Sequence, residues 1–275
     1  MKPGLYKDMP AEKYHRLPFA AQSSLKILRD QTPAHLRYRL DHPYEFETPA
    51  MRFGTLVHTA VLEPDRFDAT HVRGIEGDGR KKEIKEAREE LAKSGKTVVD
   101  PADFDLCMQI RDAVRNHRMA RLLFDGESER SAIWKDAETG VLCKGRFDHV
   151  SEVSGVLVDL KTTTDASPAG FERSVYNFGY YIQAAHYMAG ANALGMGLRH
   201  LVIIAAEKVP PYCVGVYRIE ADAVAAGDEE LRPLLRLYAE CMESGNWPGY
   251  EDKVHPISMP DWAFRKMSER TVNYD

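Results

Sequence analysis

The stretch from Lys144 to Thr164, KGRFDHVSEVSGVLVDLKTTT, constrains the fold of this 275-residue chain more than any other. Apolar residues alternate with other residues between Val156 and Lys161, and this period of two is typical of a β-strand. Turn-forming residues at 151–155 separate it from a preceding strand that ends at Val150. We therefore predict a β-hairpin at the centre of the protein.

Charged side chains stand at the end of this hairpin. Because side chains at alternate strand positions share a face, Asp159 and Lys161 should project to one side and Leu160 to the other. Asp148 is placed to face Asp159 across the pair. Two carboxylates and an ammonium on a rigid sheet make a candidate site for a hard divalent cation and an activated water. The alternative is that these charges face solvent or form salt bridges, although the apolar run VLVDLK favours a buried neighbourhood.

This pattern resembles the core of the PD-(D/E)XK nucleases. The similarity lies in Asp148, then a strand turn, then Asp159-Leu160-Lys161. Phe147 occupies the position of the proline in the motif's name. The resemblance implies an α/β fold with the central sheet of a restriction-endonuclease-like core.

Two further motifs resemble the RecB-like branch of this superfamily. GTLVH, residues 54–58, is similar to its upstream histidine motif, and QAAHY, residues 183–187, is similar to its Q-x-x-x-Y helix motif. The opening SSLKILRDQTPAHLRY, followed by GTLVHTAVLEP, most resembles the RecE (exonuclease VIII) type of phage recombination nuclease. The similarity covers roughly residues 23–250.

The resemblance assigns roles to the residues of the motifs. Asp148 and Asp159 would bind Mg²⁺, for which Mn²⁺ can substitute, with His58 and the Leu160 carbonyl as further ligands. Lys161 would position or activate the attacking water and stabilise charge on the phosphate.

The remaining motif residues have two interpretations each. Gln183 and Tyr187 lie one helical turn apart, and the family similarity favours a role in orienting the site and the DNA backbone. On the pattern alone, Tyr187 is as readily a core residue. His58 is either a metal ligand or a satisfied core histidine. Gly54, one turn before it, predicts the close approach of another backbone or a ligand.

The function implied by the resemblance is a metal-dependent double-strand DNA exonuclease that digests 5′ to 3′ and generates 3′ single-stranded tails for recombination. The family similarity also implies a homo-oligomeric ring around double-stranded DNA ends and a single-strand annealing protein of RecT type as partner. The alternatives are a RecB-like repair nuclease or an endonuclease, a non-catalytic DNA-binding protein with a decayed site, and a metal enzyme acting on other substrates.

The N-terminal region holds candidate DNA contacts. Helices are predicted to begin at Ser23-Ser24, with a hydroxyl as N-cap, and at Thr32-Pro33. A phosphate pocket would use the residues Ser23, Ser24, Lys26 and Arg37. These helices can equally be ordinary surface helices.

Two other charged segments have weaker signals. Glu127 or Glu129, on a strand predicted over 127–136, is a candidate further metal carboxylate, although edge strands often carry exposed glutamates. The charged segment 74–96 predicts a solvated helix that can also contact DNA through Arg80, Lys81 and Lys82.

Composition limits the remaining possibilities. Hydrophobic residues make up 44% of the chain, which is enough for a core. The net charge of −5 argues against an extensive basic surface but is compatible with a local basic groove for DNA. Four scattered cysteines predict neither a zinc site nor an iron–sulfur cluster. With no signal peptide or apolar span, we expect a cytoplasmic protein without a membrane segment.

We expect one nuclease domain over residues 1–275, with a mixed central sheet flanked by helices. Its parts would be an N-terminal arm and helices (1–48), a catalytic core (49–250) and a C-terminal tail (251–275). In the core we predict helices over 48–62, 100–117 and 220–244, strands over 200–206 and 214–219, and helices after Pro168 and Gly179.

Overall fold

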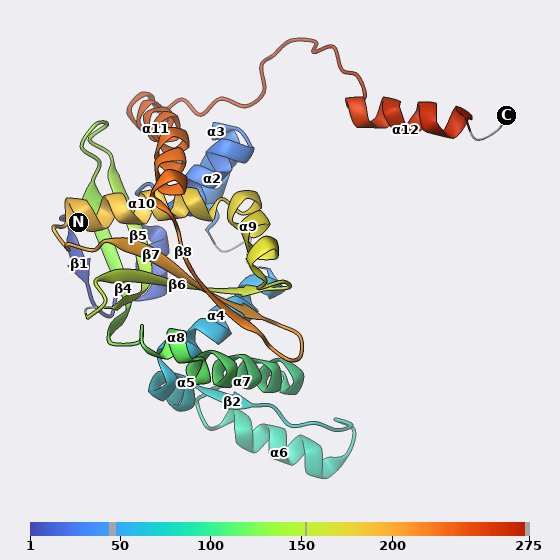
Figure 1. Ribbon diagram of the computed structural model, residues 1–275. Helices are drawn as coiled ribbons and strands as arrows, with labels where there is room; N and C mark the ends of the chain where they lie inside the picture. Colours follow the sequence, from blue (N-terminus) through green and yellow to red (C-terminus); the bar gives the residue numbers. More distant parts are fainter. Residues whose placement is uncertain (44–47, 152, 273–275) are drawn as a thin grey trace.

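A six-stranded mixed sheet forms the centre of the computed structural model, which describes residues 1–43, 48–151 and 153–272. The strand order is β1-β4-β5-β6-β7-β8, and all neighbours are antiparallel except β6 and β7. The strands are β1 (Gly4–Tyr6), β4 (Gly126–Lys135), β5 (Leu142–Ser151), β6 (Val156–Thr163), β7 (His200–Glu207) and β8 (Val214–Arg218). The predicted α/β fold with a mixed central sheet is confirmed (Figure 1).

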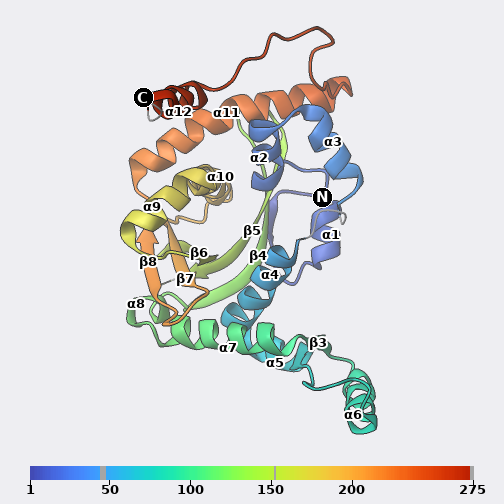
Figure 2. The ribbon, with the colours of Figure 1, turned by 90° about the vertical axis from the view of Figure 1, so that its right-hand side faces the viewer.

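Helices cover both faces of the sheet, and each face has its own apolar cluster (Figures 1 and 2). On one face lie α2 (Gln22–Asp30), α3 (Pro33–Asp41), α9 (Pro168–Asn177), α10 (Tyr180–Ala193) and α11 (Ala221–Ser244). On the other lie α4 (Pro49–Leu62), α5 (Pro64–Thr70), α7 (Pro101–Asn116) and α8 (Arg118–Arg121). The alternation in β6 divides its side chains between the two clusters. Val158 and Leu160 pack against α4 and α7, while Leu157 packs on the α10 side.

The central hairpin is β5 and β6, as predicted, with residue 152 of its turn outside the described part of the chain. Several helix starts follow the expected chemistry. Thr48 accepts a hydrogen bond from the amide of Met51 at the start of α4, and Asp100 accepts one from Ala102 at the start of α7. Proline is the first residue of both helices, where its missing amide costs nothing.

The prediction that a serine at 23–24 caps the first helix of the N-terminal region is wrong. Helix α2 begins at Gln22, and its N-cap is Ala21 without a side-chain cap. The reason is a backbone bridge to the sheet: Ala20 bonds to Leu142 and Lys144 of β5, so that the chain leaves the sheet and enters the helix at once.

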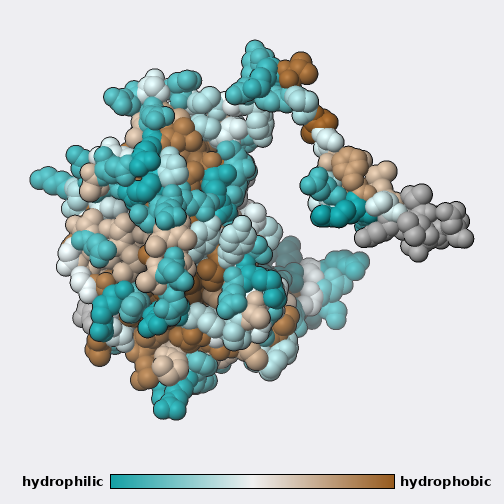
Figure 3. All heavy atoms as spheres, turned by 45° about the horizontal axis from the view of Figure 1, so that its top comes forward, coloured by the Kyte–Doolittle hydropathy of each residue, from teal (hydrophilic) through white to brown (hydrophobic). Residues whose placement is uncertain are grey.

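Both chain ends contain structure that the sequence patterns do not reveal. The N-terminal arm pairs β1 with β4 and contains the short helix α1 (Ala11–Arg16). A three-residue strand is too short to show periodicity. The C-terminal tail contains α12 (Asp261–Val272), which stands apart from the rest of the protein (Figures 1 and 3). Exposed apolar residues, among them Val254 and Ile257, lie on the connection to it.

A small appendage lies beyond α7. It consists of the parallel pair β2 (His71–Arg73) and β3 (Thr97–Val99) and the projecting helix α6 (Lys82–Ala92) (Figure 2). No helix in the described ranges is long and apolar enough to cross a membrane.

Candidate active site

Two carboxylates meet at the end of the β5–β6 hairpin. The strands pair through His149 opposite Val158, so that the next residues along are Asp148 and Asp159. Both are buried, and Asp148 Oδ2 accepts a hydrogen bond from the amide of Leu160 at 2.8 Å. Burial raises the pKa of Asp148, the charge of His58 opposes the shift, and the nearby charge of Asp159 adds to it. The hairpin therefore places two carboxyl groups together in an environment that penalises negative charge.

Lys161 supplies the positive charge on the same face. Its Nζ lies 2.6 Å from Asp159 Oδ2 and 5.1 Å from the centre of the Tyr180 ring. Burial acts to lower the pKa of Lys161, but the carboxylates of Asp159 and Asp148 outweigh it, so that the pKa lies above its usual value. Lys161 is thus held as an ammonium group.

The helix α10 fixes the other oxygen of Asp159. Gln183 Nε2 donates a hydrogen bond to Asp159 Oδ1 at 2.6 Å. Tyr187, one turn further, lies edge-on to Phe147 at 5.1 Å and is packed close to Gly145. Burial raises its pKa well above the usual value. Of the predicted pair, the structure brings Gln183 into direct contact with the site and places Tyr187 in the packing behind it.

Helix α4 brings His58 to the opposite side of the two carboxylates. His58 Nε2 lies 2.7 Å from the Leu160 carbonyl oxygen, and its Nδ1 lies 3.4 Å from Asp148 Oδ2. Of the four predicted metal ligands, His58, Asp148 and the Leu160 carbonyl therefore lie together, while the oxygens of the adjacent Asp159 lie against Gln183 and Lys161. A side chain at Gly54 would meet nothing within 4 Å, so the described chain makes no close approach there.

Glu129 of β4 joins this group. One ligand atom from each of His58, Glu129 and Asp148 lies within 4.8 Å of the others. Burial and the neighbouring Asp148 raise the pKa of Glu129 to about 8. Glu127 behaves differently, because it pairs with Lys7 and Arg130. Glu129 has a left-handed backbone (φ 53°), which departs from strand alternation, so periodicity could not tell which glutamate faces Asp148.

These residues fit a hard divalent cation. Asp159 Oδ2 is buried, and its close partner is the Lys161 ammonium at 2.6 Å. The ligand atoms of His58, Glu129 and Asp148 lie within 4.8 Å of one another, close enough to share one ion. Carboxylate, carbonyl and imidazole donors are also a set that Mg²⁺ or Mn²⁺ accepts. Divalent metals are used throughout the PD-(D/E)XK nucleases, and this site has suitable donors.

The predicted phosphate pocket is not assembled in the same way. Ser24 is buried, while Lys26 donates to the carbonyl of Phe178 at 3.4 Å. Arg37 is paired with Asp41 on its own helix and lies 5.4 Å from the centre of the Trp247 ring. Lys26 thus faces the α9–α10 connection, and Arg37 faces the segment that follows α11. A joint pocket with Ser23 would require Arg37 to leave Asp41.

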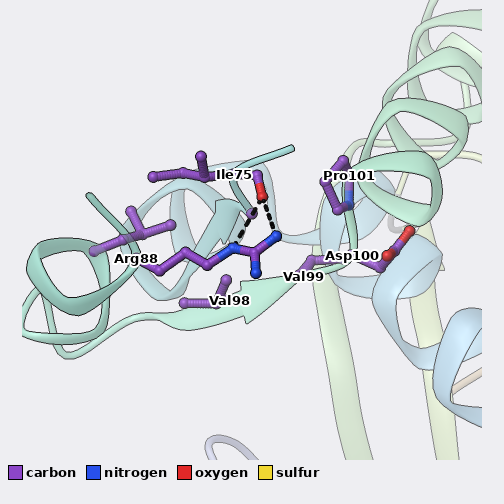
Figure 4. Close-up of a pocket in the computed structure, with 8 residues that line it drawn as sticks. Ile75, Arg88, Val98, Val99, Asp100 and Pro101 are labelled. Atoms are coloured by element: carbon purple, nitrogen blue, oxygen red, sulfur yellow. Dashed lines mark hydrogen bonds between the residues drawn. The ribbon is translucent and has the colours of Figure 1, made fainter. Parts of the chain in front are cut away.

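The appendage has no link to the carboxylates in the described contacts. Arg80 is 92% exposed at its side chain and pairs with Asp78, as expected for a solvated segment. A shallow pocket between α6 and β3 is lined by residues that include Ile75, Val98 and Arg88 (Figure 4). Arg88 donates to the Ile75 carbonyl at 3.0 Å, so its guanidinium holds the preceding loop. The four cysteines are free thiols.

The fold and site define a PD-(D/E)XK-like α/β protein. Residues 21–258 match the family described as "PDDEXK-like domain of unknown function (DUF3799)". The match covers most of the chain, and the protein therefore belongs to this family, which confirms the superfamily indicated by the motifs.

The structure is also similar to a crystal structure of a "putative exonuclease" from Eubacterium rectale. The TM-score is 0.63, over 94% of this chain and 98% of that chain, at 14% sequence identity. At this identity the similarity shows a shared fold. No curated protein matches the sequence.

Proposed function

We propose that this protein is a metal-dependent double-strand DNA exonuclease that digests 5′ to 3′ and leaves 3′ single-stranded tails for recombination. The observation that carries the proposal is the cluster of the buried Asp148 and Asp159 with the partly buried Lys161, with His58 and Glu129 beside it. Nuclease chemistry also agrees with the PDDEXK-like family. The polarity and the role in recombination rest on the resemblance to RecE-type nucleases.

Each residue has a task in phosphodiester hydrolysis. Asp148, Asp159, Glu129, His58 and the Leu160 carbonyl would hold the cation, and bound Mg²⁺ would neutralise charge on the phosphate and lower the pKa of its water. His58 would bind the cation through Nδ1, which lies 3.4 Å from Asp148 Oδ2, while a proton on Nε2 would keep the hydrogen bond to the Leu160 carbonyl.

Lys161 and Gln183 act on the carboxylate and the substrate. The raised pKa of Lys161 favours electrostatic stabilisation of the developing negative charge over removal of a proton from water. Gln183 donates to Asp159 Oδ1 and Lys161 lies against Oδ2, so the two side chains together would fix the orientation of this carboxylate.

The assembly and surroundings belong to the same proposal. We infer a homo-oligomeric ring around the ends of double-stranded DNA, an annealing partner of RecT type, a cytoplasmic location and a single nuclease domain over residues 1–275. All four follow from the family resemblance and the sequence patterns.

The test is digestion of end-labelled linear duplex with Mg²⁺, Mn²⁺, Ca²⁺ or EDTA. We expect loss of nucleotides from 5′ ends with Mg²⁺ or Mn²⁺ only, and no cutting of covalently closed circles. Cutting of circles would identify an endonuclease. Binding of the duplex without cleavage under any of these conditions would identify a non-catalytic DNA-binding protein.

A second assay tests the N-terminal phosphate contacts. If Ser23, Ser24, Lys26 and Arg37 hold the 5′ phosphate, a 5′-phosphorylated duplex should be digested faster than a 5′-hydroxyl duplex. Arg37→Ala should narrow that difference, and added salt should slow digestion. Equal rates on both ends would remove these contacts and leave the metal site untouched.

A further inference from the structure

We propose that Phe178 and Tyr176, at the connection between α9 and α10, form a stacking platform for an unpaired base of the strand being cut. The inference rests on the proposed nuclease function and adds to it a binding site for the nucleobase. It is carried by the exposure of both rings, by the position of Phe178 relative to Lys161, and by a cation beside Phe178.

Both rings expose half or more of their surface. Phe178 is 51% exposed and Tyr176 is 73% exposed. Their neighbours are used within the fold: Phe171 is buried, and Tyr181 donates a hydrogen bond to Glu230. The exposed rings of Tyr176 and Phe178, two residues apart at one helix connection, therefore offer apolar surface that a ligand can cover.

Each ring is supported from behind. Tyr176 is stacked on Tyr181, with ring planes 9° apart and centres 6.2 Å apart. Phe178 lies 5.7 Å from Tyr180 at an interplanar angle of 33°. The contacts hold the rings in place, so a ligand that stacks on them would lose little side-chain entropy on binding.

The platform adjoins the reactive end of the hairpin. Lys161 Nζ lies 5.1 Å from the Tyr180 ring centre, and that ring lies 5.7 Å from Phe178, which puts Phe178 within about 11 Å of Lys161 Nζ. Stacked nucleotides rise about 3.4 Å each along a strand. A strand whose scissile phosphate lies at Lys161 therefore reaches Phe178 within about three nucleotides.

The ammonium group of Lys26 lies beside the Phe178 ring. Lys26 Nζ lies 5.8 Å from the Phe178 ring centre and donates to the Phe178 carbonyl. Aromatic rings beside cations are the arrangement by which proteins bind single-stranded nucleic acid, since bases stack on the rings and phosphates pair with the cations. A base inside a duplex has both faces covered, so only a terminal or unpaired base can use the platform.

The test is binding of a fluorescently labelled single-stranded oligonucleotide in EDTA, where no metal-dependent cleavage occurs. Phe178→Ala should raise the dissociation constant on the order of 10-fold, the effect of losing one stacked base. Phe178→Trp should retain binding, and Phe178→Leu should not. The matched control is Tyr250→Ala, an exposed aromatic on the α3 side. Unchanged binding in Phe178→Ala and Tyr176→Ala would overturn the platform.

Two further measurements distinguish a failure of the stacking platform from a failure of the proposed nuclease function. Steady-state digestion by Phe178→Ala should show a raised KM on frayed ends with little change in kcat. A 2-aminopurine placed two or three nucleotides from the cut should change its fluorescence on binding to the unmodified protein, a readout that needs no variant. No digestion by the unmodified protein would refute the proposed function, and an unresponsive 2-aminopurine would refute the platform.

Discussion

Two neighbouring strands of the sheet, β5 and β6, each hold a lysine in a different environment, and the comparison separates chemistry from stability. Lys161 of β6 lies against Asp159 and near Asp148. Lys144 of β5 donates through its Nζ to the carbonyls of Tyr14 and Leu17, at 2.8 and 2.7 Å.

Their pKa values move in opposite directions. Burial lowers the pKa of Lys144 to about 8, and the charge of Arg146 adds to the shift. For Lys161 burial acts in the same direction, but the two carboxylates prevail and its pKa rises. Burial alone therefore does not make a lysine catalytic. Lys144 binds the end of α1 to the sheet, whereas Lys161 lies beside the carboxylates of the candidate site.

The largest effect should come from removing Lys161. We expect Lys161→Ala to reduce DNA cleavage on the order of 10²- to 10³-fold or more, because a preorganised charge is lost at the phosphate. Asp159→Ala should be as damaging and should also weaken metal binding, which calorimetry can measure. Near-normal digestion by either variant would contradict the assignment of the site.

Replacing His58 should change the metal concentration that DNA cleavage requires. His58→Ala should raise the Mg²⁺ concentration for half-maximal activity by about 10- to 100-fold, in line with the loss of a metal-site group. If His58 is instead a core residue, the same variant should lose thermal stability with unchanged metal dependence. Both measurements on one preparation decide between these interpretations.

Replacing Lys144 should reduce stability and spare cleavage, the reverse of the result expected on replacing Lys161. Lys144→Met should lower the free energy of unfolding by about 1–3 kcal/mol, because carbonyls at the end of α1 lose their donor. Cleavage per folded molecule should stay near normal. Urea unfolding and active-site titration test this, and a cleavage defect in a stably folded Lys144→Met protein would break the comparison.

The smallest effect concerns pH and His186, whose Nε2 lies 3.1 Å from the Lys144 carbonyl. Burial lowers the pKa of His186 from 6.5 to about 4. Between these two pH values His186 is protonated in the unfolded chain and neutral in the folded protein. The free energy of unfolding should therefore fall as pH drops from 6.5 toward 4. The expected slope is up to about 1.4 kcal/mol per pH unit. His186→Gln should have a shallower slope in urea unfolding from about pH 7 to about pH 5, and equal slopes would contradict the assignment.

Much of the site could be predicted because its residues lie on elements with strong local signals. The β5–β6 hairpin follows from alternation and turn residues, and its register alone puts Asp148 beside Asp159. Proline and an N-cap threonine fix the start of α4, and so the position of His58 along that helix. Glu129 was only one of two candidates, because a left-handed residue hides its direction from any periodic pattern.

The sequence by itself determined the hairpin and several helix starts, because strand alternation and helix capping act over a few residues. The motif resemblance indicated the α/β class and the candidate metal ligands Asp148, Asp159 and His58. Only the tertiary structure decided which charges meet. It gave Lys161 two carboxylates and Lys144 three backbone carbonyls, selected Glu129 over Glu127, and placed Lys26 beside Phe178. The physical reason is that the properties of a buried charge depend on its neighbours in space, and those neighbours come from segments far apart in the chain.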